Sequence, residues 1–99
     1  MTKERRMITA IVVMNCEVGK VHSVAETLTQ LDGVAEVYSV SGEMDILAIC
    51  KVSQYESLAT LVTQEMAGIE GVTKTNTHMA FQAYSKHDME KVWAETMGL

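Results

Sequence analysis

The chain has 99 residues, of which 47% are hydrophobic, and a formal net charge of −5 at pH 7. This length supports one hydrophobic core, so we expect a single domain over residues 1–99 with its packed core at about 8–84. No apolar run reaches the roughly 20 residues that span a bilayer. The negative charge opposes binding to the phosphates of nucleic acids or of an anionic membrane. We therefore expect a cytoplasmic protein that binds neither a membrane nor DNA on its own.

Two kinds of hydrophobic pattern alternate along the chain. Runs of β-branched and apolar residues predict strands, and apolar residues at helical spacing predict helices. In chain order we expect a strand at 7–16, a helix at 21–31, strands at 34–41 and 46–52, a helix at 54–69 and a strand at 72–84. The sequence "SQYE" predicts a capping box at the second helix, with Ser53 as the N-cap and Glu56 reaching back to it.

The chain also repeats itself with an offset of 38 residues, because "LDGV" at 31–34 aligns with "IEGV" at 69–72. Apolar positions of the preceding strand and helix align with the same offset, so each copy predicts a strand, a helix and a second strand. The order β-α-β-β-α-β is that of the ferredoxin-like fold, an α+β architecture. It predicts a four-stranded antiparallel sheet with two helices on one face.

The other face of this sheet needs a cover. The first and third strands are apolar on both faces. In the first, Ile8, Ala10, Val12 and Met14 alternate with Met7, Ile11 and Val13, and in the third, Ile46, Ala48 and Cys50 alternate with Leu47, Ile49 and Val52. Two helices can cover only one face, so one set of apolar residues in each strand remains. Packing against the sheet of an identical subunit, about a two-fold axis, would bury them. In the alternative, a short C-terminal helix folds back over its own sheet. The apolar stripe that predicts this helix consists of Met89, Val92, Trp93 and Met97.

The sequence shows no catalytic, metal-binding or phosphate-binding motif. The histidines at positions 22, 78 and 87 are scattered, and Cys16 and Cys50 lie in apolar runs without CxxC spacing. We therefore expect reduced thiols, no metal, no cofactor and no enzymatic activity.

The segment between the second and third strands, "SGEMD", has two interpretations. Gly42 and Asp45 are typical residues of a tight hairpin turn. Alternatively, amides around Gly42 could receive a carboxylate while Asp45 pairs with an ammonium group, as a free amino acid would require. Hydroxyls of Thr73 and Thr75 could contribute, although alternating threonines are also good strand formers.

"LTQLDGVAEVYSVSGEMDILAIC" at 28–50 and "IEGVTKTNTHMAFQAY" at 69–84 together resemble the effector-binding domain of the Lrp/AsnC, or feast/famine, regulators. This domain is also called RAM. The specific elements are the V-x-G-x-x-D hairpin, the two x-x-G-V segments and the threonine-rich last strand. The resemblance runs from about Ile8 to Tyr84.

The resemblance implies a ferredoxin-like domain whose sheets pair in dimers, which assemble into octameric or decameric rings. It also implies that amino-acid effectors bind between dimers, near the hairpin. Carried over by position, the expected ligand-binding residues are Ser41, Gly42, Glu43, Met44 and Asp45, together with Thr73 and Thr75.

Full-length members of this family also carry an N-terminal helix-turn-helix domain, whereas only seven residues precede Ile8, where the resemblance begins. We therefore expect a stand-alone module that influences transcription through full-length Lrp/AsnC regulators. The alternatives are a small dimeric ferredoxin-like enzyme, such as a cofactor-free monooxygenase or a lactone isomerase, and a purely structural oligomer. Such enzymes usually line their cavity with aromatic and histidine side chains, and this chain has only five aromatic residues, namely one Trp, one Phe and three Tyr.

Overall fold

The strands and helices follow one another in the expected order. A computed structural model describes residues 7–86. Its elements are β1 (Ile8–Cys16), α1 (Val21–Leu28), β2 (Val34–Ser39), β3 (Ile46–Val52), α2 (Tyr55–Thr60), a π-helical continuation of α2 termed η1 (Leu61–Met66), and β4 (Val72–Ala80).

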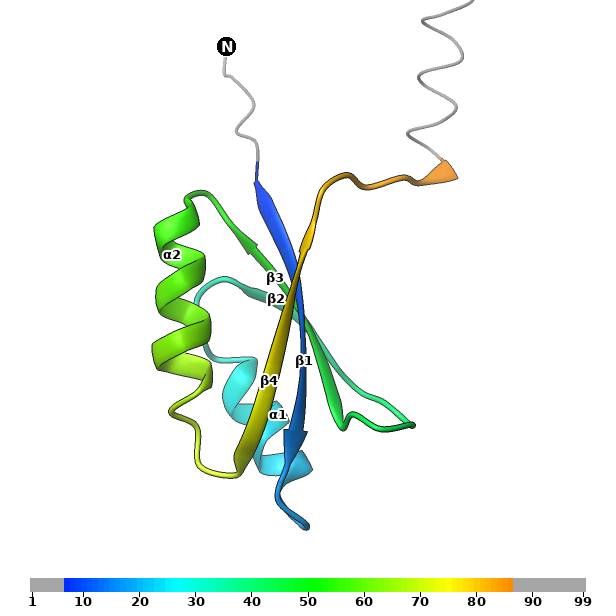
Figure 1. Ribbon diagram of the computed structural model, residues 1–99, viewed down its shortest axis with the longest axis vertical. Helices are drawn as coiled ribbons and strands as arrows, with labels where there is room; N and C mark the ends of the chain where they lie inside the picture. The colour runs from blue at the N-terminus through cyan, green and yellow to red at the C-terminus, as the bar shows by residue number, and fades with distance from the viewer. Residues whose placement is uncertain (1–6, 87–99) are drawn as a thin grey trace, which may run out of the picture.

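The four strands form one sheet in the order β2-β3-β1-β4, and all neighbouring strands are antiparallel. Both helices lie against the same face of this sheet (Figure 1). β2 and β4 begin at Val34 and Val72, which matches the sequence repeat. The prediction of a ferredoxin-like fold is confirmed.

The core lies between the sheet and the helices. Alternate residues of the central strands point toward the helices, because successive side chains of a strand face opposite ways. Ala10, Val12 and Met14 of β1 are fully buried, and each is flanked by residues that are only partly buried. The helices contribute Val24, Leu28, Leu58, Leu61 and Met66, and β3 contributes Ile46, Ala48, Cys50 and Val52.

The second face of the sheet carries apolar side chains, and no helix within residues 7–86 lies over them. Ile11, Val13, Leu47 and Ile49 are partly buried by their neighbours in the sheet. The expected packing of this face against a second subunit stays a prediction.

The predicted capping box is wrong. The N-cap of α2 is Gln54, whose backbone is extended with φ −135° and ψ 146°, and no side chain caps the helix there. Ser53 lies one residue too early for this role. Glu56 instead occupies the first turn of α2, where a negative charge is favourable near the positive end of the helix dipole.

Two strands end earlier than predicted. β4 ends at Ala80 rather than near Tyr84, because its partner β1 begins at Ile8 and the last paired residues are Thr9 and Ala80. β2 ends at Ser39, where its pairing with Ile46 ends. The predicted C-terminal helix, with its stripe from Met89 to Met97, lies outside the described residues.

Helix α2 widens into a π-helix in its second half. The amide of Ala67 donates to the carbonyl of Val62 at 3.3 Å, five residues earlier. The wider turn places Leu61 and Met66 on the same side, and both are buried in the core.

Candidate functional site

The hairpin between β2 and β3 is the first candidate site. The amide of Val40 donates to the carbonyl of Asp45 at 3.0 Å, which closes the connection. Gly42 at the tip has φ +106°, a conformation that side chains other than glycine rarely adopt. A Cβ added at this position would meet no atom within 4 Å. The tip therefore projects into open space, and its backbone is accessible to a ligand.

Asp45 fastens this hairpin to the end of β1. Its amide donates to the carbonyl of Met14 at 3.0 Å, and its Oδ2 accepts the amide hydrogen of Cys16 at 2.8 Å. Asn15 donates from Nδ2 to the carbonyl of Glu43 at 2.7 Å. The pairing of β1 with β4 shifts between Asn15 and Cys16, so the Asp45 carboxylate binds a backbone amide where the sheet is irregular. The carboxylate is thus held in a fixed position.

The Asp45 carboxylate also changes the chemistry of the neighbouring thiol. Burial raises the pKa of Cys16, and the negative charge of Asp45 raises it further. Burial alone raises the pKa of Cys50. Both cysteines are free thiols. Because the thiolate is the reactive form, neither environment prepares a nucleophile.

The structure brings together only part of the predicted site. Residues 41–45 share the hairpin; Met44 and Asp45 are half-buried and the rest are exposed. Thr73 and Thr75 belong to β4, which lies on the other side of β1. Two strand spacings, roughly 10 Å, therefore separate Thr75 from the β3 side of the sheet. A ligand touching Asp45 and Thr75 of one chain would have to lie across β1.

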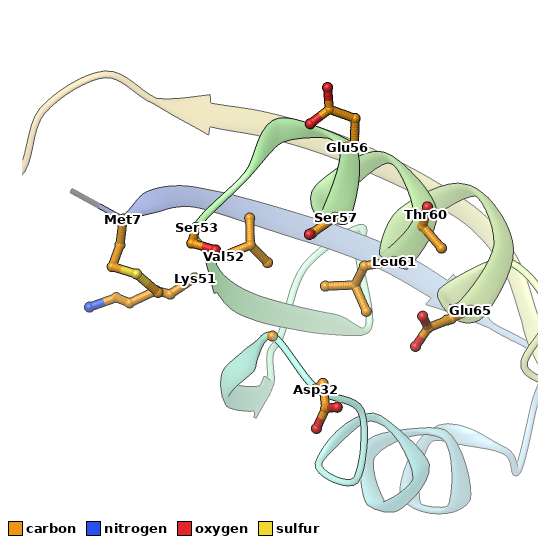
Figure 2. Close-up of a pocket in the computed structure, with 11 residues that line it drawn as sticks. Met7, Asp32, Lys51, Val52, Ser53, Glu56, Ser57, Thr60, Leu61 and Glu65 are labelled. Carbon is orange, nitrogen blue, oxygen red and sulfur yellow. The ribbon is translucent and has the colours of Figure 1, made fainter. Parts of the chain in front are cut away.

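A cleft that the sequence did not reveal lies at the opposite end of the sheet (Figure 2). Its volume is about 550 Å³, and it runs between α2–η1, the end of β3 and the loop before β2. Buried Val52 and Leu61 form its apolar part. The cleft also contains one ammonium group and three carboxylates, and the Lys51 and Glu65 side chains lie at opposite ends of it. Single polar residues spread over a helix, the end of β3 and two loops form no recognisable motif, so sequence reasoning missed them.

Within residues 7–86 no group of three or more His, Cys, Asp or Glu side chains could hold a metal ion. In the same part of the chain no helix is long and apolar enough to cross a membrane.

The sequence model of the family described as "Lrp/AsnC ligand binding domain" matches residues 9–90. The chain belongs to this family. The predicted resemblance is therefore confirmed, and with it the assignment to the ligand-binding domains of transcriptional regulators.

Individual relatives agree with this assignment. An uncharacterised HTH-type transcriptional regulator from Pyrococcus furiosus is 32% identical over 75 residues, which are 76% of this chain and 50% of that protein. The chain thus spans about half the length of such curated relatives.

Solved structures show the same fold. A crystal structure from Thermus thermophilus is 39% identical, has a TM-score of 0.75, and covers 80% of this chain and 99% of its own. A transcriptional regulator from Neisseria meningitidis, solved as a complex with L-methionine, has a TM-score of 0.71. It is 12% identical and covers 79% of this chain and 52% of its own, so it shows the fold alone.

Proposed function

We propose that this Lrp/AsnC ligand-binding domain binds a free amino acid at the β2–β3 hairpin and acts as a non-enzymatic regulatory module. The observation that carries the proposal is the position of Asp45, whose carboxylate is held at the end of β1 by the Cys16 amide. A carboxylate has about four lone-pair sites. The bond from Cys16 therefore leaves capacity to accept hydrogen bonds from the ammonium group of an amino acid.

The rest of the hairpin suits the other half of such a ligand. Backbone amides near Gly42 are exposed at the tip and can receive the ligand carboxylate, as anions are often bound by backbone amides. Ser41, Glu43 and Met44 lie in the same loop and would determine which side chain is accepted. The L-methionine bound to the Neisseria meningitidis regulator is a ligand of this chemical class.

In the proposed assembly, a neighbouring subunit completes the amino-acid site at the hairpin. Apolar residues on the open face of the sheet, such as Ile11 and Ile49, are suited to packing two subunits face to face. Dimers that then form octameric or decameric rings would place a neighbouring subunit over the hairpin. Thr73 and Thr75, which β1 separates from Asp45 within one chain, would act from that neighbouring subunit.

We place this module in the cytoplasm, where it influences transcription through full-length Lrp/AsnC regulators rather than through its own contact with DNA. The net charge of −5 supports this, since attraction to phosphates dominates nonspecific DNA binding. No observation favours the alternative of a dimeric ferredoxin-like enzyme to a similar degree.

The test is a calorimetric titration of the purified chain with each proteinogenic amino acid. We expect at least one to bind with measurable heat. Absence of binding across the whole set, in protein shown to be folded and oligomeric, would contradict the proposal and favour a purely structural oligomer.

A further inference from the structure

The cleft shown in Figure 2 carries an excess of negative charge that the proposed function does not use. Three carboxylates line it, those of Asp32, Glu56 and Glu65, against the one ammonium group of Lys51, which gives a formal sum of −2. All four side chains are exposed. Neither of the ion pairs formed among residues 7–86 involves these carboxylates. The cleft therefore presents unpaired negative charge within the described part of the chain.

These charges suit an occupant that carries several separate cations. Within residues 7–86 no three His, Cys, Asp or Glu side chains come together at a position that could hold a metal ion, so the carboxylates of the cleft do not converge on a single point. Hydroxyl groups of Ser53, Ser57 and Thr60 also line the cleft and can accept hydrogen bonds from cations. Its volume of about 550 Å³ lies in the range of binding pockets. The cleft thus fits an extended cationic segment.

The chain itself supplies such a segment beside the cleft. Met7 lines one end of the cleft, as Figure 2 shows. The six residues that precede Met7 in the sequence, "MTKERR", carry Lys3, Arg5 and Arg6 against Glu4, a formal sum of +2. Positive and negative charge of the same formal size are therefore neighbours in one chain.

The length of this segment also suits the cleft. An extended chain advances about 3.3–3.6 Å per residue, so six residues span roughly 20 Å. Glu56 and Glu65 are nine positions apart on the continuous helix α2–η1, which corresponds to roughly 14 Å along its axis. A segment that starts at Met7 is therefore long enough to follow this helix.

We infer that the cleft binds the basic segment at residues 1–6 of its own chain, with the cations of Lys3 and Arg5 against the carboxylates of Glu56 and Glu65. In an extended segment residues 3 and 5 share a side, because successive side chains face opposite ways. Lys51 disfavours a cation at the start of the segment. The strongest attraction is therefore further along the cleft, where both glutamates lie.

This contact competes with other anions for the same three cations. Attraction to phosphates dominates nonspecific binding to DNA. A segment held in the cleft has its charge neutralised by the protein, which agrees with a module that does not contact DNA directly. The contact uses neither the β2–β3 hairpin nor the open face of the sheet, so its failure would leave the proposed amino-acid site unaffected.

Limited proteolysis by trypsin, which cleaves after Lys and Arg, measures how often the segment leaves the cleft. Glu56→Gln combined with Glu65→Gln removes two carboxylates and should raise the rate of cleavage within residues 1–6 about two- to thirtyfold, the effect of losing two surface charge pairs. Glu17→Gln combined with Glu26→Gln is the matched control, because it removes the same charge at exposed positions outside the cleft. It should be cleaved at the wild-type rate. Equal rates in the two double variants, measured by mass spectrometry, would overturn the inference.

A disulfide test distinguishes the cleft of the same chain from that of another copy. Thr2→Cys keeps all three cations of the segment, and Thr60→Cys places a thiol in the cleft. Under mild oxidation the chain with both changes should close on itself, and mass spectrometry identifies the bonded pair beside the native Cys16 and Cys50. In the control, Thr27→Cys at an exposed position of α1 replaces Thr60→Cys and should bond much less. A bond that forms only between copies, or equally well with Thr27→Cys, contradicts docking in the chain's own cleft.

Discussion

The Oδ2 of Asp45 lies 2.8 Å from the amide nitrogen of Cys16, and these residues are 29 positions apart in the sequence. This hydrogen bond joins the start of β3 to the end of β1. It gives Asp45 a structural role in addition to the ligand-binding role that we propose, and different substitutions separate the two.

Stability should depend on the side-chain oxygen of Asp45 rather than on its charge alone. Asp45→Ala removes the acceptor for the Cys16 amide, and losing a hydrogen bond to a charged group costs about 1.5–3 kcal/mol. Asp45→Asn keeps an oxygen at that position and should lower the free energy of unfolding less. Urea denaturation measures both values. Asp32→Ala, at an exposed position in the loop before β2, is the control and should change stability little. Equal losses for Asp45→Ala and Asp45→Asn would contradict the structural role of the hydrogen bond.

The reactivity of Cys16 should respond to the charge of Asp45. Burial and then the Asp45 charge raise the pKa of this thiol, so neutralising Asp45 should lower that pKa while burial continues to raise it. In Asp45→Asn, alkylation of Cys16 at a fixed mildly alkaline pH should therefore be faster than in the wild-type chain. Mass spectrometry of samples quenched at successive times measures the alkylation rate of each cysteine. Cys50 serves as the internal reference, since burial alone raises its pKa and its rate should stay the same. A slower reaction of Cys16 would show that the sign is wrong.

Gly42 and Gly19 offer a matched pair of substitutions. Both have positive φ, +106° and +82°, and a Cβ would meet no neighbour within 4 Å at either position. Alanine at either site should destabilise the fold through backbone strain of about 1 kcal/mol. Only Gly42→Ala should also weaken binding of the amino acid, because it displaces the hairpin amides. Thermal unfolding and calorimetry compare the two variants. If Gly19→Ala weakened binding as much as Gly42→Ala, the effect would not be local to the hairpin.

The open face of the sheet should hold two subunits together. Ile49→Lys places a charge among apolar residues of this face and should convert dimers to monomers, because an unpaired charge is costly to bury. Gln30→Lys adds the same charge at an exposed loop position and should leave the mass unchanged. Multi-angle light scattering at micromolar concentration measures the mass. A wild-type chain that is monomeric in this measurement would remove the basis of the proposed ring.

Much of the fold is predictable from this sequence because the signals are periodic. Alternation in β1 and β3 and the repeat of "LDGV" and "IEGV" predict the order of strands and helices along the chain and show that both faces of the central strands are apolar. Ends of elements are less predictable, since β4 ends where β1 ceases to offer a partner, and that depends on tertiary pairing. The prediction of the N-cap was wrong for the same reason. Ser53 and Glu56 have the spacing of a capping box, but the path of the chain makes Gln54 the N-cap of α2.

The candidate site, too, was predictable from the sequence only in part. Gly42 and Asp45 were identifiable from their spacing in a turn. The partner of Asp45 was not, because a contact with Cys16 over 29 positions arises from sheet pairing and a register shift in β1. Nor could the sequence show that Thr73 and Thr75 lie across β1 from the hairpin, since strand order depends on how the two repeats pair.

The most direct test of the proposed function is a calorimetric comparison of the wild-type chain, Asp45→Asn and Asp32→Asn with the amino acid that binds most tightly. Loss of one partner from a desolvated charge pair costs about 2 kcal/mol or more, so Asp45→Asn should weaken binding roughly thirtyfold or more. Asp32→Asn should bind like the wild-type chain. Unchanged affinity in a folded, oligomeric Asp45→Asn protein would contradict the assignment of Asp45 as the partner of the ammonium group.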